Sequence, residues 1–478
     1  MELSGEIFSR IFSLGKNYLI ASSLEPQELK NSLEMDSQDP SEQSEGVEGT
    51  ESPEEVEDEL ILKLLNDDCL FHIMSYLNLH ELIVAERVCE RFAAVVKRVY
   101  KSYRVLDFQL FYGFWNRHLS NPETKEIALR VGKHVHTLRA ASYAFGIGPR
   151  EIPSFVSTHL KGLKNIQLER FQIANEGAVR QLADVFKGVT VAKLDSCDAI
   201  DEIVMQLLKL EQLEVLELPN NRNLYGRFLQ RLTNIKELSL EACSGISRQN
   251  FREFCEQHPN LRSLNIISCY WIDRLGLQSI CANLKNLEKI SISVDYVDVE
   301  AEDYLVLGNL PKLKHLEISS FSDNLIGVRN MNVLLMKLST YNRLEYLDLT
   351  EKNLTVDTEK ALRNFTKLKE LNLSLIFNCK DSTLDSLSCD KTLQYLQIPY
   401  SDITQQGLEK LIARCSALRF IGLYGCDNID DAFIESILEH LKGRSHMLEL
   451  GVDRYKFHRE EYGNFLGVNP SKLKLTFK

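Results

Sequence analysis

The sequence predicts an α/β protein in which a small all-α module precedes a curved repeat solenoid, a horseshoe with parallel strands on its concave face and helices on its convex face. Three observations predict this fold. Apolar residues recur at helical spacing between residues 60 and 106. A motif with apolar first, fourth and sixth positions returns about every 22 to 31 residues from residue 135 onward, and amphipathic segments separate its copies.

Length and charge divide the chain into several units and restrict its partners. The chain has 478 residues, which is too long for one compact core. Its formal net charge of −12 disfavours binding to nucleic-acid phosphates. No apolar stretch approaches the roughly 18 residues of a membrane helix. We expect neither nucleic acid nor membrane as a partner, and a location in the cytoplasm, the nucleus or both. The expected domains are a disordered acidic tail (1–59), a helical module (60–106), a linking helical collar (107–134) and the repeats (135–478).

The helical module is expected to comprise three short helices. Leu70, Ile73 and Leu77 share one helical face, and Asp67 and Asp68 are placed to cap the first helix. A bundle of about 45 residues buries too little surface to be stable alone. Its apolar surface therefore needs a cover, supplied either by another chain or by the adjoining repeats.

The sequence of this module resembles the F-box along nearly its whole length. The resemblance rests on Leu65-Asn66-Asp67-Asp68-Cys69-Leu70, Ile73, Tyr76-Leu77, Leu79, Glu81-Leu82, Val88-Cys89 and Arg91-Phe92. Asn66 stands where F-boxes usually have proline, and this departure is expected to loosen the first turn. The resemblance implies docking on a Skp-family adaptor. It divides the following residues between a small internal core and the adaptor-binding surface: Leu65, Leu70, Ile73, Leu77, Leu79, Leu82, Val88 and Phe92.

The repeats are expected to number about thirteen, each consisting of a strand, a loop and a helix. A single repeat cannot bury both its strand and its helix, so repeats fold only when stacked. Helices are wider than the roughly 4.8 Å spacing of strands, and this difference curves the stack toward the strands. Several units carry a finer signature, such as Cys269-x-x-Ile272-Asp273-x-x-Gly276-Leu277 and Cys426-x-x-Ile429-Asp430-Asp431. It resembles the cysteine-containing leucine-rich repeat that commonly follows an F-box.

The cysteines point to packing and not to chemistry. None of the eleven forms a Cys-x-x-Cys pair, and Cys243, Cys269 and Cys426 each follow a strand motif by three residues. We expect them to be small buried side chains in a reducing compartment. The sequence has no Gly-rich phosphate loop, HExxH or GxSxG motif. We therefore predict a non-catalytic protein without cofactor or metal site; a hydrolase or transferase would need a concave polar cluster with perturbed pKa values.

Residues between the apolar strand positions are expected to point into the concavity and to form columns across the stack. One column runs Val215, Glu237, Ser263, Lys289, His315, Tyr346, Glu370, Tyr395, Phe420, Glu449. Its late aromatics, with Tyr400 and Tyr424, suggest a substrate-binding patch, because exposed Tyr is a favoured anchor in protein recognition. The alternative is an aromatic stack that only stabilises the sheet. Tyr270 and Trp271, in a loop, either bind a partner or fold back on their own repeat.

These features predict the substrate-recognition subunit of a Skp–cullin–F-box ubiquitin ligase. The resemblance implies that the F-box binds the adaptor and, through it, a cullin-RING ligase, while the concave surface binds the protein to be ubiquitinated. Such a receptor acts by proximity, because it raises the effective concentration of the acceptor lysine near the activated ubiquitin. The alternative is a leucine-rich-repeat scaffold that has no ligase partner.

Overall fold

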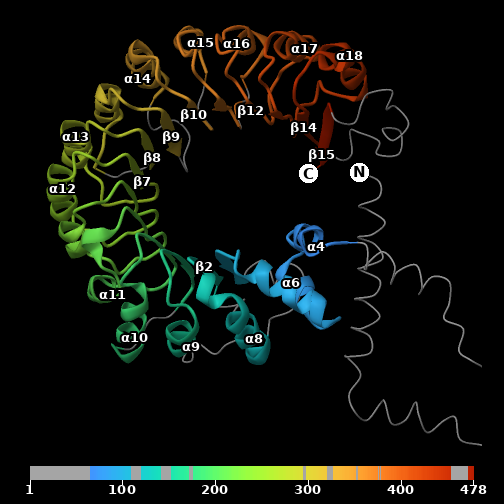
Figure 1. Cartoon of the computed structure of the whole chain (residues 1–478). Helices are drawn as coiled ribbons and strands as arrows, with labels where there is room; N and C mark the ends of the chain where they lie inside the picture. The colour runs from blue at the N-terminus through green and yellow to red at the C-terminus, as the bar shows by residue number, and fades with distance from the viewer. Residues whose placement is uncertain are drawn as a thin grey trace, which may run out of the picture.

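The chain folds into a helical module and a long arc of repeats (Figure 1). The structure, a computed structural model, describes residues 65–108, 120–141, 152–171, 176–293, 298–319, 327–350, 354–374, 376, 378–453 and 472–477. The predicted acidic tail, residues 1–59, lies outside these ranges, so its disorder stays a prediction. Among the described helices, none has the length and apolarity that crossing a bilayer requires.

The helical module contains α4 (Asp67–Met74), α5 (Leu79–Glu86) and α6 (Glu90–Tyr100). Asn66 caps α4 by accepting a hydrogen bond from the Cys69 amide at 2.8 Å. The residue expected to loosen this turn therefore stabilises it, and Asp67 and Asp68 lie in the first turn, where negative charge favours the helix N-terminus. Asn78 starts α5 with a reciprocal capping box to Glu81.

All fifteen described strands form one parallel sheet in which each strand pairs with the next in the chain. They are β1 (Val105–Asp107), β2 (Thr137–Ala141), β3 (Asn165–Glu169), β4 (Val191–Asp195), β5 (Val215–Glu217), β6 (Glu237–Ser239), β7 (Ser263–Ile266), β8 (Lys289–Ser293), β9 (His315–Ser319), β10 (Tyr346–Asp348), β11 (Glu370–Asn372), β12 (Tyr395–Gln397), β13 (Phe420–Gly422), β14 (Leu448–Val452) and β15 (Leu473–Phe477). At about 4.8 Å per strand, the concave face follows an arc of roughly 65–70 Å.

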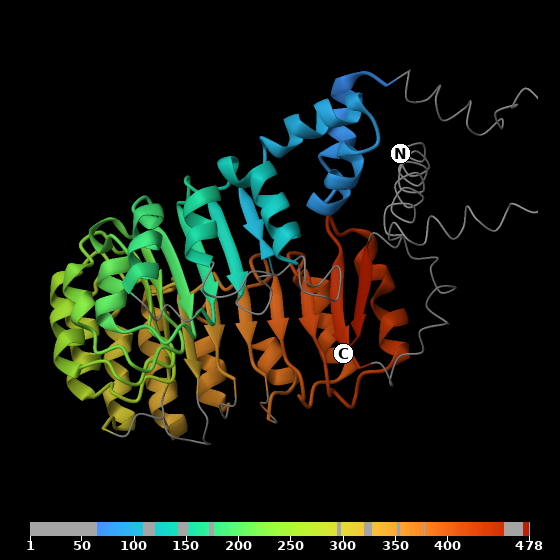
Figure 2. The same cartoon turned by 90° about the horizontal axis from the view of Figure 1, so that it is seen from below.

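Helices line the convex side of this sheet between successive strands (Figures 1 and 2). The α-helices are α8 (Asn121–Val131), α9 (Ile152–His159), α10 (Glu176–Phe186), α11 (Asp201–Leu207), α12 (Arg248–Gln257), α13 (Arg274–Asn283), α14 (Gly327–Tyr341), α15 (Val356–Leu362), α16 (Asp381–Asp385), α17 (Gln405–Arg414) and α18 (Asp431–Lys442). Short 3-10 helices are η1 (Gly132–His134), η2 (Leu210–Gln212), η3 (Arg227–Arg231) and η4 (Ala301–Asn309). The predicted α/β solenoid is confirmed.

The sheet begins earlier in the chain than the motif suggested. β1 pairs with β2 from Val105 to Asp107, so α8 and η1, in the segment expected to be a collar, occupy the convex position between two strands. Around β1 the motif spacing is carried by Tyr103, Leu106 and Phe108, so two of its three apolar positions are aromatic. At the other end β15 extends the sheet past β14.

The predicted buried cysteines connect successive repeats. Cys243, Cys269 and Cys426 are each at most 1% exposed. Their thiols donate to the strand carbonyl of the preceding repeat, at 3.0 Å to Leu218, 2.9 Å to Leu240 and 3.2 Å to Ile398 respectively. A larger side chain would overpack this position and cost about 1–3 kcal/mol.

A polar joint attaches the helical module to the first repeats. The Glu86 carboxylate accepts hydrogen bonds from the Tyr100 hydroxyl at 3.1 Å and from Arg130 Nε of α8 at 2.6 Å. Glu126 of α8 pairs with Arg130 at 3.0 Å and with Arg87 at 2.9 Å. Only four residues separate α6 from β1. The module therefore projects in a fixed direction from the edge at which the strands begin (Figure 2).

Candidate functional site

Most of the predicted adaptor-binding residues build the core of the helical module. Leu70, Leu77, Leu79, Leu82 and Phe92 are each at most 8% exposed. They hold α4, α5 and α6 together and shape the surface above them.

The remaining predicted residues reach the surface of the module. Leu65, Ile73 and Val88 are half-buried, and Leu65 and Val88 pack against the core. Tyr76, two residues after the end of α4, exposes 70% of its surface, and Val84 of α5 is half-buried. Tyr76 and Val84 were not predicted as contacts, because spacing marks a helical face without telling which part of it the chain itself covers.

The strand register aligns the predicted concave column. Pairing of β5 through β14 places Val215, Glu237, Ser263, Lys289, His315, Tyr346, Glu370, Tyr395, Phe420 and Glu449 in one row. The apolar residue that follows each of them in its strand is buried against the helices, so the column itself faces the concave side. The side chains that face the concave side are therefore two residues apart in every strand.

An aromatic pair occupies the middle of this column. The rings of His315 and Tyr346 stack with centroids 3.7 Å apart and planes 7° apart. Burial, aided by the charge of Lys289, lowers the pKa of His315 to about 4. Burial also raises the pKa of Tyr346, as do the nearby carboxylates, Asp348 first among them. Both rings are therefore neutral near pH 7, and this pair adds apolar surface without adding charge.

The C-terminal aromatic patch consists of Tyr395, Tyr400, Phe420 and Tyr424. Tyr395 and Tyr400 expose 42% and 52% of their surfaces, and Phe420 and Tyr424 are half-buried. All four come from β12, β13 and the turns that follow these strands. The structure thus brings together four of the five aromatic residues predicted for this patch and leaves them accessible. Tyr346, the fifth, lies two strands from Tyr395, with Glu370 between them.

Two glycines leave room for two rings of the patch, those of Tyr400 and Tyr424. A Cβ at Gly425 would overlap the Tyr400 ring, and a Cβ at Gly451 would overlap the end of Tyr424. Each ring therefore rests on the glycine of the next repeat. Tyr400 also has a left-handed backbone (φ +59°), a conformation that Ser196, Asn220 and other small or polar residues adopt in other turns. This strain at an exposed tyrosine is compatible with a functional position.

The second predicted pair, Tyr270 and Trp271, is divided by the structure. Trp271 is only 7% exposed, its indole donates to the Cys243 carbonyl at 2.5 Å, and its ring packs edge-on against Phe251. Tyr270 is 50% exposed. The indole therefore folds back on its own repeats, and only the tyrosine of this pair is available to a partner.

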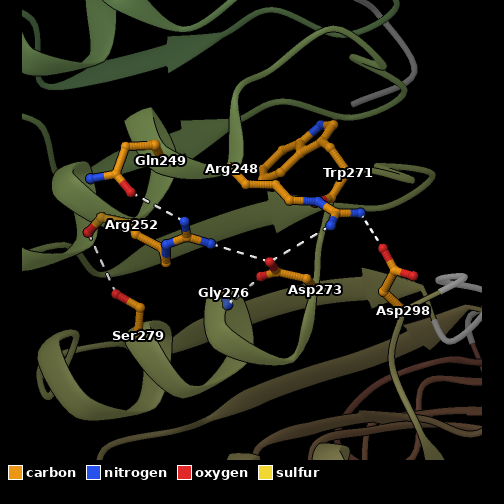
Figure 3. A network of polar contacts seen from close by, with 8 residues as sticks. All are labelled: Arg248, Gln249, Arg252, Trp271, Asp273, Gly276, Ser279 and Asp298. Carbon is orange, nitrogen blue, oxygen red and sulfur yellow. Dashed lines mark hydrogen bonds and ion pairs between the residues drawn. The ribbon is translucent and has the colours of Figure 1, made fainter.

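A polar network fixes the loop that carries Trp271 (Figure 3). Arg248 Nε donates to the Trp271 carbonyl at 3.0 Å, and its guanidinium also pairs with Asp298. Asp273 caps α13 through the Gly276 amide at 2.7 Å and accepts from Arg252 at 3.2 Å. The network links α12 to the start of α13, and every charge in it has a partner. Its evident role is to hold neighbouring repeats together.

Burial makes the interior cysteines poor nucleophiles. Desolvation raises the pKa of the Cys197, Cys243 and Cys379 thiols to about 12, so they remain protonated at neutral pH. Within the described residues no group of three or more His, Cys, Asp or Glu side chains is arranged to hold a metal ion. Cys69 and Cys89 of the helical module are exposed, and the other nine cysteines are buried.

Comparison with known proteins identifies two domains. Residues 62–103 match the family described as the F-box domain, and residues 119–333 match the leucine-rich repeat region. These matches confirm both resemblances inferred from the sequence. No curated protein sequence matches the chain.

Solved structures with a similar arrangement are distant. An internalin from Listeria monocytogenes is 18% identical, with a TM-score of 0.36, over 66% of this chain and 86% of its own. The Rad7 and Elc1 complex from yeast contains a chain that is 13% identical, with a TM-score of 0.46, over 81% of this chain and 94% of its own. Neither likeness bears on function.

Proposed function

This chain is an F-box/leucine-rich-repeat protein, and we propose on that premise that it is the substrate-recognition subunit of a Skp–cullin–F-box ubiquitin ligase. The F-box module binds a Skp-family adaptor and through it the cullin-RING ligase. The concave face of the solenoid binds the protein that is to be ubiquitinated. The substrate is then held near the activated ubiquitin, which raises the effective concentration of its lysines.

One observation carries this proposal: a module with partly exposed apolar residues is joined firmly to a long, open concave sheet. Ile73 of α4, Tyr76 just after α4 and Val84 of α5 leave apolar surface partly exposed. The Glu86–Arg130 pair fixes that surface relative to β1 and the strands beyond it. A joint of this kind preserves direction between two binding partners, as a receptor requires and a simple tether does not.

The receptor itself contributes selection and orientation. Its buried thiols remain protonated because burial raises their pKa values. Ubiquitin transfer is therefore assigned to the other subunits of the ligase, and the chain is proposed to be non-catalytic. Protein partners in the cytoplasm or the nucleus fit this role.

Pull-down of a purified Skp-family adaptor with the full chain tests the proposal. Ile73→Ser removes a partly exposed apolar side chain from α4, and adaptor affinity is expected to fall about tenfold or more, since burying such a side chain contributes about 1.5–3 kcal/mol. Lys97→Ser, at an exposed position of α6, is the matched control and should bind normally. Leu82→Ala should instead destabilise the module by about 2–5 kcal/mol. A wild-type chain that fails to bind the adaptor would exclude the ligase role and leave the scaffold alternative.

A further inference from the structure

We propose that the concave face of β9–β14 binds an extended substrate segment rich in Arg or Lys, whose cationic side chains lie on the C-terminal aromatic patch and pair with the carboxylates around it. The inference rests on the proposed function only in taking this segment to be part of the protein marked for ubiquitination. Binding of the segment itself needs no adaptor.

Charge is distributed unequally along the two inward columns, which are the positions on either side of the central apolar residue of each strand. From β1 to β8 they carry three acidic and three basic residues, Asp107, Glu217, Glu237, Arg139, Lys193 and Lys289. Arg139 pairs with Asp107 at 3.5 Å, and Lys193 pairs with Glu217 at 3.1 Å. In these two columns, this half of the face therefore carries equal numbers of acidic and basic residues.

From β9 to β14 the same two columns carry only negative charge near pH 7. They contain Glu317, Asp348, Glu370 and Glu449 and no Lys or Arg. His315 adds no positive charge, because burial lowers its pKa to about 4. An acidic or phosphorylated segment would therefore meet repulsion here, whereas a cationic one would be attracted.

The partners of these carboxylates are mostly neutral. Glu317 accepts from the Ser291 hydroxyl at 2.6 Å, and Asp348 accepts from Asn372 at 2.8 Å. Glu370 is exposed, and no ion pair to it is present among the described residues. Glu449 alone of the four pairs with a lysine, Lys474 of β15. Most of the negative charge on these strands thus has no counter-charge from the described part of the chain.

Cations at the neighbouring strand starts are largely occupied. Lys314 pairs with Glu288 at 2.7 Å, and Lys369 pairs with Glu345 at 2.6 Å. Arg419 is exposed at the start of β13 and lies outside the two inward columns. The strand starts therefore do not neutralise the inward face.

The aromatic patch supplies the second half of the recognition. Exposed tyrosine and phenylalanine faces attract Arg and Lys, and a guanidinium stacks flat on such a ring. Tyr395 lies one strand from Glu370 in the same column, and Phe420 lies one strand from Glu449. The backbone positions of Tyr395 and Phe420 are therefore each one strand spacing, about 4.8 Å, from that of a carboxylate residue. This alternation suits a segment whose Arg or Lys residues alternate with apolar residues.

Side chains, not backbone pairing, must provide this binding. Every strand from β9 to β14 already pairs with a strand on each side, so none offers a free edge for strand addition. The segment consequently crosses the strands, and its specificity depends on the two inward columns.

Selection from a random twelve-residue peptide library displayed on phage, with the full chain as bait, tests the inference. Peptides retained by the wild-type chain are expected to be several-fold enriched in Arg and Lys over the unselected library. The double variant Glu370→Gln/Tyr395→Ala should lose this enrichment. The matched control is Glu237→Gln/Tyr225→Ala. Glu237 is exposed in the same column on β6, and Tyr225 is exposed outside the patch. This variant should show the same Arg and Lys enrichment as wild type.

A synthetic copy of the most enriched peptide, labelled for fluorescence anisotropy, provides the second measurement. Replacing each Arg with citrulline and each Lys with norleucine removes charge at nearly constant size, and affinity is expected to fall at least tenfold. Failure of the library to enrich any peptide, enrichment of neutral or acidic peptides, or equal binding by the patch variant would each overturn the inference. Adaptor pull-down with the same variants should be unchanged, so failure here is distinguishable from failure of the ligase proposal.

Discussion

Glu86→Ala is expected to loosen the joint between the helical module and the solenoid while leaving both binding surfaces in place. Glu86 and Arg130 are 2.6 Å apart with side chains only 16% and 22% exposed. Burial alone would lower the pKa of Arg130, but the hydrogen bond and charge of Glu86 outweigh it and raise that pKa. The pair is therefore favourable in the folded chain, and its loss leaves a partly buried cation with less compensation.

The magnitude follows from that partial burial. Removing one partner of a fully buried pair costs about 3–5 kcal/mol, and an exposed pair contributes about 0–1 kcal/mol. Because Arg130 would keep Glu126 at 3.0 Å, we expect a loss of about 2 kcal/mol. Asp68→Ala is the control, since it breaks an exposed pair with Arg98 at 3.0 Å and should cost less than about 1 kcal/mol.

Thermal unfolding and a reconstituted ubiquitination assay measure the two consequences. In Glu86→Ala the first transition of the thermal unfolding curve should move to a lower temperature. Ubiquitin transfer to bound substrate should slow several-fold, although adaptor and substrate affinities measured separately stay near wild type. If stability falls and transfer does not, a fixed direction between the two surfaces is unnecessary. An unchanged melting curve would refute the energetic argument itself.

Two further predictions concern the solenoid. Asn221→Ala should lower the free energy of unfolding by about 3–5 kcal/mol in urea titrations. The buried Asn221 side chain accepts hydrogen bonds from the Cys197 and Ala199 amides and donates to three carbonyls, so truncation leaves two buried N–H groups without acceptors. A loss below about 1 kcal/mol would contradict this. His315 has a folded pKa of about 4, below the unfolded value, so the unfolded chain binds protons more readily as pH falls from about 6.5 to about 4, and stability should decline across that window. In His315→Gln that decline should be smaller between about pH 7 and about pH 5, and an identical decline would show that His315 does not contribute.

The repeat architecture was predictable because its signal is local and repeated. A motif with three apolar positions, as in Leu213, Leu216 and Leu218, can bury all three only in one register. Once each strand is placed, stacking aligns the columns, and the row from Val215 to Glu449 follows without tertiary information. The buried cysteines follow for the same reason.

Features that depend on contacts between repeats could not be predicted. Trp271 turns inward because a carbonyl of the preceding repeat, that of Cys243, accepts its indole N–H. Asn221 lies three residues beyond Leu218, the position that Cys243 holds in the next repeat, so the spacing marks it as buried. Its partners, two amides and three carbonyls, are visible only in the structure. Likewise, the helical spacing of Leu70 and Ile73 is the same whether a side chain faces the core or the adaptor. The fold of the module was therefore predicted, and the division of its residues between core and surface required the structure.

The curvature of the solenoid connects the two proposed binding surfaces. In chain order the F-box module and the aromatic patch are far apart, since the module precedes β1 and the patch lies on β12–β13. The arc turns back on itself, so the module and the C-terminal strands both flank its open side (Figure 1). A segment held by β5–β8 would lie at the far side of the horseshoe, whereas a segment on the patch would lie toward the open side that the helical module flanks. On the proposed function, the position of the patch and the rigidity of the Glu86 joint serve one purpose, which is to orient a bound substrate toward the ligase.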